Sequence, residues 1–161
     1  MANTNLNGKG PLNPSVPPLL IKAQYIKDLS FENPHMLEIL QGLKGNPDIS
    51  VNVRVDVHPV ADHDFEVVLS LQASAKHEEK TLFVAELSYG GIFQVSPDVP
   101  EESIKPIVSI ECPRLLFPFA RNILADVTRD GGIPPVFLHP IDFVGLYQQK
   151  IQEENQGVSK E

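Results

Sequence analysis

The sequence has no tryptophan, a single cysteine and fewer basic than acidic residues. Cys112 alone cannot form a disulfide within the chain, which argues against a disulfide-stapled secreted domain. No run approaches the ~20 apolar residues that span a bilayer, so direct membrane insertion is not expected. With 13 Lys and Arg against 21 Asp and Glu, the formal net charge is -8, which repels a phosphate backbone. These absences argue against nucleic acid as a partner and favour a soluble protein in a reducing compartment.

Motifs of common enzyme families are also missing. The sequence has no Walker loop, no Rossmann glycine fingerprint, no nucleophile elbow and no paired-cysteine zinc signature. Four residues of metal-binding type lie close together: Asp62, His63, Asp64 and Glu66. They fall in a short hairpin without the spacing of a known metal site, so we predict a solvated turn. A small metal-dependent enzyme using His63 and its acidic neighbours is the alternative. Cys112 lies in an apolar stretch and is predicted to be a buried packing residue. We expect no enzyme activity, no metal and no cofactor.

A chain of 161 residues is expected to form one domain, here with two flexible ends. Residues 1–18 carry four prolines among Asn, Gly and Ser and are predicted to be disordered. They lack the features of a signal or transit peptide, so we expect the protein to stay where it is made. Residues 19–152 are predicted to form the folded domain, and residues 153–161 a flexible polar tail.

Four segments alternate between apolar and polar residues, as strands with one buried face do. They are Ile21–Glu32, Ile49–Val57, Phe65–Ser74 and Thr81–Val95. In the first segment the alternation puts Tyr25 on the same face as Ile21 and Leu29. The connections after the second and third segments are short and polar, which favours antiparallel hairpins. The pair Gly90-Gly91 predicts a bulge or bend in the fourth strand.

Beyond Pro100, apolar residues spaced three and four apart predict a helix that ends at Gly131. Pro118 should begin or kink this helix. After a proline-rich connector, Asp142 is predicted to cap a second helix with an apolar stripe. We therefore predict an α+β domain, in which a four-stranded antiparallel sheet carries two helices packed on one face.

Two surface features suggest binding. Alternation exposes an acidic group on the first and fourth strands, which is either a solvated face or a docking patch for a basic partner. Two irregular connections, Asn33–Pro47 and Pro134–Leu138, are rich in apolar residues. These residues either pack beneath their loops or form a subunit interface or a hydrophobic groove.

Four segments together give the chain a specific resemblance. They are Tyr25–Glu32 (YIKDLSFE), Phe65–Leu69 (FEVVL), Gly90–Phe93 (GGIF) and Cys112–Arg121 (CPRLLFPFAR). With the order of strands and helices, they resemble SecB, the bacterial protein-export chaperone family, over about residues 20 to 150. The resemblance implies a cytoplasmic homotetramer, a dimer of dimers, that holds unfolded preproteins and delivers them to the translocase ATPase SecA. A related chaperone dedicated to a single client, such as an antitoxin, is the alternative.

The resemblance also implies three groups of site residues. Those matching the SecA-binding positions are Asp28, Ser30, Glu32, Val84 and Glu86. Those matching positions that bear on assembly are Ala85, Leu87 and Tyr89. The family presents a client-binding groove between the crossover and the second helix. Candidates for that groove, chosen for their apolar character, are Met36, Leu37, Leu40, Phe137, Phe143 and Tyr147.

Overall fold

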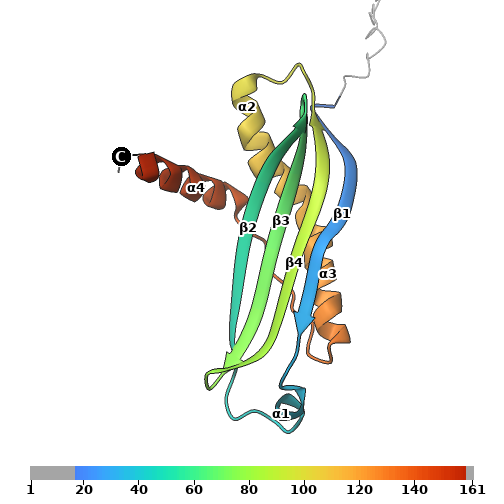
Figure 1. The fold of residues 1–161 in the computed structure, drawn as a ribbon, viewed down its shortest axis with the longest axis vertical. Helices are drawn as coiled ribbons and strands as arrows, with labels where there is room; N and C mark the ends of the chain where they lie inside the picture. The colour runs from blue at the N-terminus through green and yellow to red at the C-terminus, as the bar shows by residue number, and fades with distance from the viewer. Residues whose placement is uncertain (1–16, 159–161) are drawn as a thin grey trace, which may run out of the picture.

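The computed structural model describes residues 17–158. In chain order its elements are β1 (Leu19–Glu32), α1 (Met36–Leu40), β2 (Asp48–Ala61), β3 (Asp64–His77), β4 (Lys80–Val95), α2 (Glu101–Pro106), the π-helical turn η1 (Ile107–Glu111), α3 (Cys112–Asp130) and α4 (Phe143–Val158). The strands form one antiparallel sheet in the order β1-β4-β3-β2 (Figure 1). The predicted α+β class with a four-stranded antiparallel sheet is confirmed. Most of the tail predicted to be disordered, residues 1–16, lies outside the described residues, as do residues 159–161.

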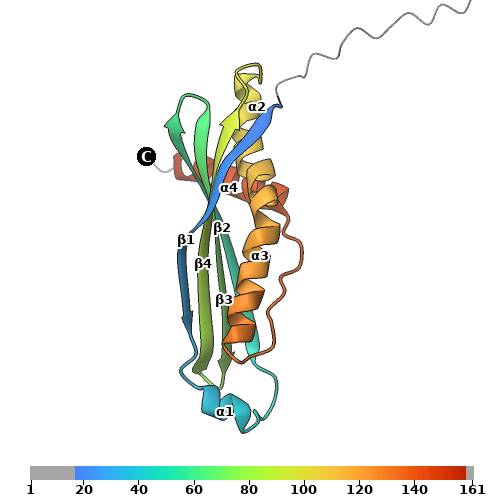
Figure 2. The same ribbon diagram turned by 90° about the vertical axis from the view of Figure 1, so that its right-hand side faces the viewer.

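One long helix covers the middle of the sheet. α3 runs lengthwise along one face, which we call the inner face; the opposite side is the outer face (Figure 2). The inward residues of β3 are fully buried there, with Val67 and Leu69 at 0% exposure. They share one apolar cluster with Leu116 and Leu124 of α3. The predicted alternation of β3 is therefore confirmed, and this cluster is the core of the domain.

The first strand departs from simple alternation. Its pairing with β4 shifts between Ile21 and Ala23 and again between Ile26 and Asp28, so β1 carries one extra residue at each place. Each extra residue reverses the faces of those that follow. Tyr25 lies between the two shifts and reaches Glu66 on the outer face. The prediction that Tyr25 shares a face with Ile21 is wrong for this reason.

The two glycines of β4 serve close packing. The pairing of β4 shows no bulge on β4 at this pair: the two shifts against β1 add residues to β1, and the shift against β3 leaves Leu82 as the extra residue of β4. A Cβ atom on residue 90 would lie 2.8 Å from Cε2 of Tyr25. A Cβ atom on residue 91 would lie 2.7 Å from Cε2 of Phe93. Both positions are occupied by glycine because aromatic rings approach the backbone there.

The helical segment after Pro100 passes through three prolines. α2, η1 and α3 follow one another without a break from Glu101 to Asp130. The π-helical turn ends at Glu111, two residues before Pro113, which lacks the N–H that an α-helix would direct to Ser109. Pro118 lies inside α3 rather than at its start. Because Pro118 has no N–H, the carbonyl of Arg114 receives no hydrogen bond within the helix. Both residues are exposed, so water can donate a hydrogen bond to that carbonyl.

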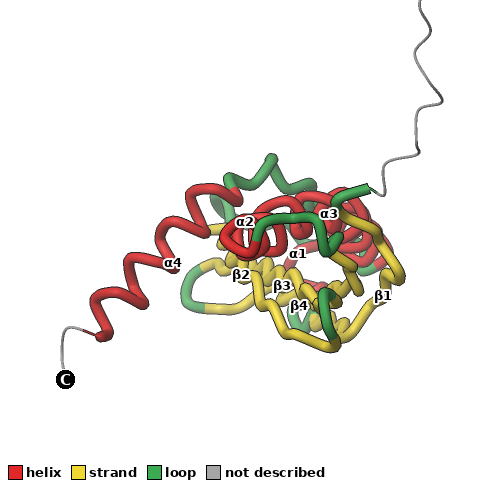
Figure 3. The backbone as a smooth tube through the Cα atoms, turned by 90° about the horizontal axis from the view of Figure 1, so that it is seen from above, coloured by secondary structure: helices red, strands yellow, loops and turns green. Residues whose placement is uncertain are grey.

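The last helix projects from the domain. The side chain of Asp142 accepts a hydrogen bond from the backbone N–H of Gly145 at 3.0 Å, which confirms the predicted cap. α4 then extends past the β2 edge of the sheet, away from α3 (Figures 1 and 3). Only its first turns pack against the core, so the sheet is covered mainly by α3 and by η1, which is continuous with it. α4 continues to Val158, and residues 153–158 of the predicted tail are helical.

Candidate functional site

The predicted SecA-binding residues lie together on the outer face. Ser30 pairs with Glu86 across β1 and β4, and Glu32 pairs with Val84. Asp28 is opposite Ser88, two residues further along the same face. We call the five residues Asp28, Ser30, Glu32, Val84 and Glu86 the acidic surface.

The carboxylates of the acidic surface are not neutralised by neighbours. Within residues 17–158, Asp28, Glu32 and Glu86 form no ion pair. Glu86 accepts a hydrogen bond from the amide of Gln72 at 3.0 Å, and Gln72 in turn accepts one from Asn52 at 3.3 Å. This chain of amides orients Glu86 without cancelling its charge.

A polar hollow of about 480 Å³ adjoins the acidic surface. Asp28 and Glu86 line it together with Ser88, which is opposite Asp28, and Ser70, which is opposite Ser88 on β3; the two serine hydroxyls are 3.3 Å apart. Because serine side chains are short, they leave space above this part of the sheet, and a side chain of a partner can approach both carboxylates.

The other end of the outer face has its charges paired. Lys22 contacts Asp64 at 2.8 Å, and Lys27 contacts Glu66 at 2.8 Å. The hydroxyl of Tyr25 also donates a hydrogen bond to Glu66. These donors, Lys27 first and then Tyr25, hold the pKa of the Glu66 carboxyl below its usual range. Burial, together with the hydrogen bond and charge of Glu66, raises the pKa of Tyr25 to about 12.

The predicted assembly residues of β4 lie in the core of the domain. Ala85 and Leu87 are 0% and 1% exposed, and Tyr89 is 7% exposed. The ring of Tyr89 stacks on Phe119 of α3, with centroids 6.3 Å apart. These residues are therefore covered within the domain, and Tyr89 supports α3, whose Phe119 is half exposed.

The six groove candidates lie at several places in the fold. Leu37 and Leu40 are exposed on α1, at the end of the sheet where β1 leaves it, and Met36 packs onto a second small cluster with Phe83. Phe137 is exposed in the connector before α4. Tyr147 lies on α4.

Phe143 lies in the core and is not part of an exposed groove. Its ring is 2% exposed and packs edge-on against Phe117, with centroids 6.0 Å apart. The apolar stripe of α4 begins with this residue, and its first turn is anchored in the core. Phe143 therefore holds α4 in place.

A different apolar surface runs along β2. Its inward residues, here called the β2 strip, are Ile49, Val51, Val53, Val55 and Val57. Three hollows follow the strip in turn. The first adjoins Phe137 at the Ile49 end, and the second and third lie beneath α4, where Tyr147 lines both. Phe137 and Tyr147 thus flank the same strip at different points.

The strip is uncovered because one helix is too narrow for the sheet. Four strands span roughly 14 Å between their outermost axes, and a helix with its side chains is about 10 Å wide. α3 sits on the middle strands and leaves Ile49 59% and Val51 41% exposed. Sequence alternation predicted that these residues face inward, and it carries no information on whether a helix reaches them.

β2 is also an open edge of the sheet. The backbone carbonyl of Val55 accepts a hydrogen bond from the Lys150 ammonium at 3.3 Å, so this carbonyl points away from β3. In an antiparallel strand, alternate residues direct both backbone groups to the same side. The backbone N–H and C=O groups that point away from β3, here called the outward row, therefore belong to the same residues that form the β2 strip. An extended chain could pair with this row while its side chains enter the hollows.

The predicted turn is confirmed at Asp62 and His63, whereas Asp64 and Glu66 lie on β3. His63 has a positive φ of 61° in the turn between β2 and β3. Its acidic neighbours Asp64 and Glu66 are engaged by lysines. Across residues 17–158, no three His, Cys, Asp or Glu side chains are placed to hold a metal ion. Cys112 is fully buried, as predicted, and burial raises the pKa of its thiol to about 12, so it is a poor nucleophile.

Comparison with protein families gives one match over most of the chain. The family model described as preprotein translocase subunit SecB matches residues 13–154. None of the helices between residues 17 and 158 has the length and apolar character needed to cross a membrane.

Curated relatives support the same match. Protein-export protein SecB of Agrobacterium fabrum is 54% identical over 138 residues, covering 86% of each chain. The corresponding protein of Xanthobacter autotrophicus is 46% identical over 149 residues, covering 92% of this chain and 95% of the relative. That of Sinorhizobium medicae is 52% identical and covers 92% of this chain and 88% of the relative.

A solved structure has the same fold. It is the SecB-like chaperone Rv1957 of Mycobacterium tuberculosis in complex with a ChAD peptide from the antitoxin HigA1, Rv1956. The TM-score is 0.60 at 15% identity, and the match covers 77% of this chain and 91% of the other. At this identity the likeness extends to the fold alone.

Proposed function

Because this chain belongs to the SecB family of protein-export chaperones, we propose that it holds unfolded precursor proteins in a translocation-competent state and delivers them to SecA. Such a chaperone acts by binding rather than by chemistry. A protein that binds the unfolded state of a client and not the folded state shifts the folding equilibrium toward the unfolded state. The activity therefore needs an accessible apolar surface and no catalytic group.

The observation that carries this proposal is the β2 strip. It combines half-exposed valines with a row of outward backbone groups on one open edge. The five residues span ~30 Å, enough for an extended client segment of about ten residues. Backbone pairing tolerates many sequences, and the hollows select for apolar side chains at alternate positions. Both properties suit clients that share no common sequence.

The acidic surface is the proposed site for SecA. Its three acids form no ion pair with the described part of the chain, and they lie on the opposite side of the sheet from the β2 strip. A basic partner surface would be steered to it by charge, and binding would weaken as salt rises. Separate faces would let the chaperone bind client and SecA at the same time.

We further propose a homotetramer, built as a dimer of dimers. A second apolar surface supports it: Leu115 and Phe119 of α3 are 41% and 51% exposed, and Ile26 and Leu29 of β1 are 48% and 40% exposed. Ile26 pairs with Tyr89, which stacks on Phe119, so β1 and α3 contribute to one patch. Ala85, Leu87 and Tyr89 would influence assembly by supporting this patch from beneath.

Assembly would also strengthen client binding. One strip buries few side chains and part of that gain is lost in ordering the client. When several strips belong to one particle, later contacts become intramolecular and can raise the avidity of a long client ~10² to 10⁴-fold.

We place this activity in the bacterial cytoplasm and assign the protein no cofactor. The alternative of a chaperone dedicated to one antitoxin is less well supported, since the curated relatives carry the name of protein-export proteins.

The decisive experiment compares the two faces of one strand. In Ile49→Asp with Val51→Asp, two charges enter the β2 strip. In Ser50→Asp with Asn52→Asp, the same charges enter the outer face. We expect the first variant alone to lose the ability to suppress aggregation of a chemically unfolded preprotein, followed by light scattering. Equal suppression by both variants would show that clients bind elsewhere.

A further inference from the structure

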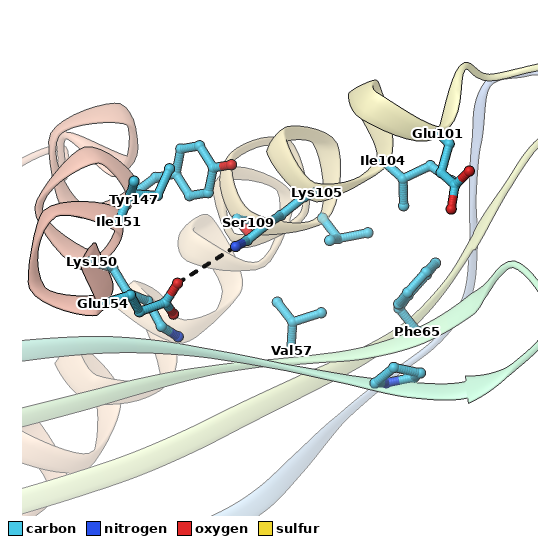
Figure 4. A pocket seen from close by; sticks show the side chains of 12 residues that line it. Val57, Phe65, Glu101, Ile104, Lys105, Ser109, Tyr147, Lys150, Ile151 and Glu154 are labelled. Carbon is cyan, nitrogen blue, oxygen red and sulfur yellow. Dashed lines mark ion pairs between the residues drawn. The ribbon is translucent and has the colours of Figure 1, made fainter. Parts of the chain in front are cut away.

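Two polar contacts tie α4 across the far half of the β2 strip. The ammonium of Lys150 donates a hydrogen bond to the backbone carbonyl of Val55 at 3.3 Å. The ammonium of Lys105, on α2, lies 3.6 Å from a carboxylate oxygen of Glu154 (Figure 4). α4 crosses the strip between these contacts, while Ile49 and Val51 lie clear of it.

The Val55 contact occupies a position that a paired strand would need. The carbonyl belongs to the outward row of β2, so a chain added to this edge would direct a backbone N–H to it. Lys150 supplies a donor at the same place. As long as it does, an extended chain can pair with β2 only as far as the residues before Val55.

Behind this contact lies an apolar cavity of about 470 Å³. Its apolar lining is drawn from β2, β3, the helical segment before α3, and α4: Val57, Phe65, Ile104, Val108, Tyr147 and Ile151 (Figure 4). Its size is in the range of pockets that hold small ligands, which is ample for one bulky apolar side chain. Charged groups, Lys105 and Glu154 among them, stand at its rim.

We propose that α4 is a gate over the far half of the β2 strip, and that Lys150 stands in for the backbone N–H of a client. When α4 moves, the Val55 carbonyl accepts a hydrogen bond from an extended client segment, and a bulky apolar side chain of that segment enters the cavity. This inference rests on the proposed function, because it assumes that clients bind along β2.

The contacts that close the gate are suited to being broken. The side chains of Lys105 and Glu154 are 64% and 54% exposed, and exposed ion pairs contribute little to stability. Lys150 is also exposed. A client that forms several backbone hydrogen bonds along β2 can replace one side-chain donor. Short segments can bind at Ile49 and Val51 without opening the gate, and longer ones must open it.

The test measures peptide affinity by fluorescence anisotropy on the full chain. The probe is a labelled twelve-residue peptide of alternating Val and Thr, and the variant is Lys150→Met, which keeps the length of the side chain and removes the donor. Freeing one carbonyl from its competing hydrogen bond should tighten binding about three- to tenfold. The same peptide N-methylated at alternate residues lacks the backbone donors and should gain nothing.

Two further variants distinguish the release of the Val55 carbonyl from the loss of a positive charge. Lys150→Arg keeps a donor and should bind like the wild type. Lys105→Met removes the same charge and one tether but leaves the Val55 carbonyl occupied, so its affinity should change less than twofold. An unchanged affinity in Lys150→Met, or an equal gain in Lys105→Met, would overturn the gate while leaving client binding intact. If the wild type bound neither this peptide nor an unfolded preprotein, the proposed function itself would fall, and the gate with it.

Discussion

The two ends of the outer face carry similar residues in opposite electrostatic states. At one end Asp64 and Glu66 are each paired with a lysine of β1 at 2.8 Å. At the other end Asp28 and Glu86 have no ion-pair partner among residues 17–158. A carboxylate already beside a cation offers little to a second one, because the field of the pair is largely cancelled. The paired end therefore contributes to the stability of the sheet, and the unpaired end remains available to a partner.

The largest expected effect comes from reversing the unpaired charges. In Asp28→Lys with Glu86→Lys, two attractive contacts become repulsive, and we expect SecA affinity to fall by more than ~100-fold. Titration calorimetry measures this, and native mass spectrometry should find the oligomeric state unchanged. The core does not include either side chain, so folding should be unaffected.

The matched control reverses two exposed acids away from the outer face. Glu79→Lys with Glu102→Lys changes the net charge by the same amount, and should alter affinity only through long-range steering. If this control weakened SecA binding as much as the double variant of the acidic surface, net charge rather than a local site would govern the interaction.

The second prediction concerns the packing of the paired end. A Cβ atom at residue 90 would lie 2.8 Å from the Tyr25 ring, which its hydrogen bond to Glu66 holds in place. Gly90→Ala should therefore lower the free energy of unfolding by roughly 1 to 3 kcal/mol. In a Tyr25→Ala background the ring is gone, and the same change should be neutral or stabilising by about 0.5 kcal/mol, since alanine restricts the unfolded chain. Urea unfolding of the four proteins measures the coupling; additive effects would contradict the contact.

These features show which parts of the molecule can be deduced from sequence. Alternation identified all four strands and the inward face of β3, because burial of one face imposes a period of two. It failed within β1, where two extra residues reverse the faces between them and carry Tyr25 outward. Each bulge adds a single residue and leaves no composition signal.

The candidate site was only partly predictable for a related reason. The acidic surface follows from alternation and register, and its residues meet as expected. β2 and β3 have equally regular alternation, yet Val67 is 0% exposed and Val51 is 41% exposed. Coverage depends on where α3 lies across the sheet, which is a tertiary property. Choosing groove residues by apolar character alone therefore included Phe143, a core residue, and omitted the valines of β2.

A smaller effect is expected from removing one hydroxyl at the paired end. Tyr25→Phe keeps the ring over Gly90 but leaves Glu66 with Lys27 as its remaining donor. We expect a loss of about 1 kcal/mol in the free energy of unfolding, typical of one hydrogen bond. Tyr89→Phe is the matched control, because its hydroxyl makes a long 3.3 Å contact with the neutral side chain of Gln24. Urea denaturation should find Tyr89→Phe the milder change; the reverse order would contradict the role given to Tyr25.

The smallest effect is a pH dependence of stability that arises at the paired end. The hydrogen bonds from Lys27 and Tyr25 lower the pKa of Glu66 in the folded state, while the unfolded chain has an ordinary value of about 4.3. A lowered folded pKa stabilises the protein above the unfolded value, and this contribution is lost as the pH falls through the folded one. The stability difference between the wild type and Glu66→Gln should therefore be constant near neutrality and shrink below about pH 4.3.

Tyr25 should give the opposite pH dependence. Its pKa is raised to about 12, so its contribution to stability is fully present below the unfolded value of about 10 and is lost as the pH rises toward 12. Urea titrations across both ranges test this. A difference between the wild type and Glu66→Gln that stayed constant well below about pH 4.3 would contradict the stabilisation of this carboxylate by Lys27 and Tyr25.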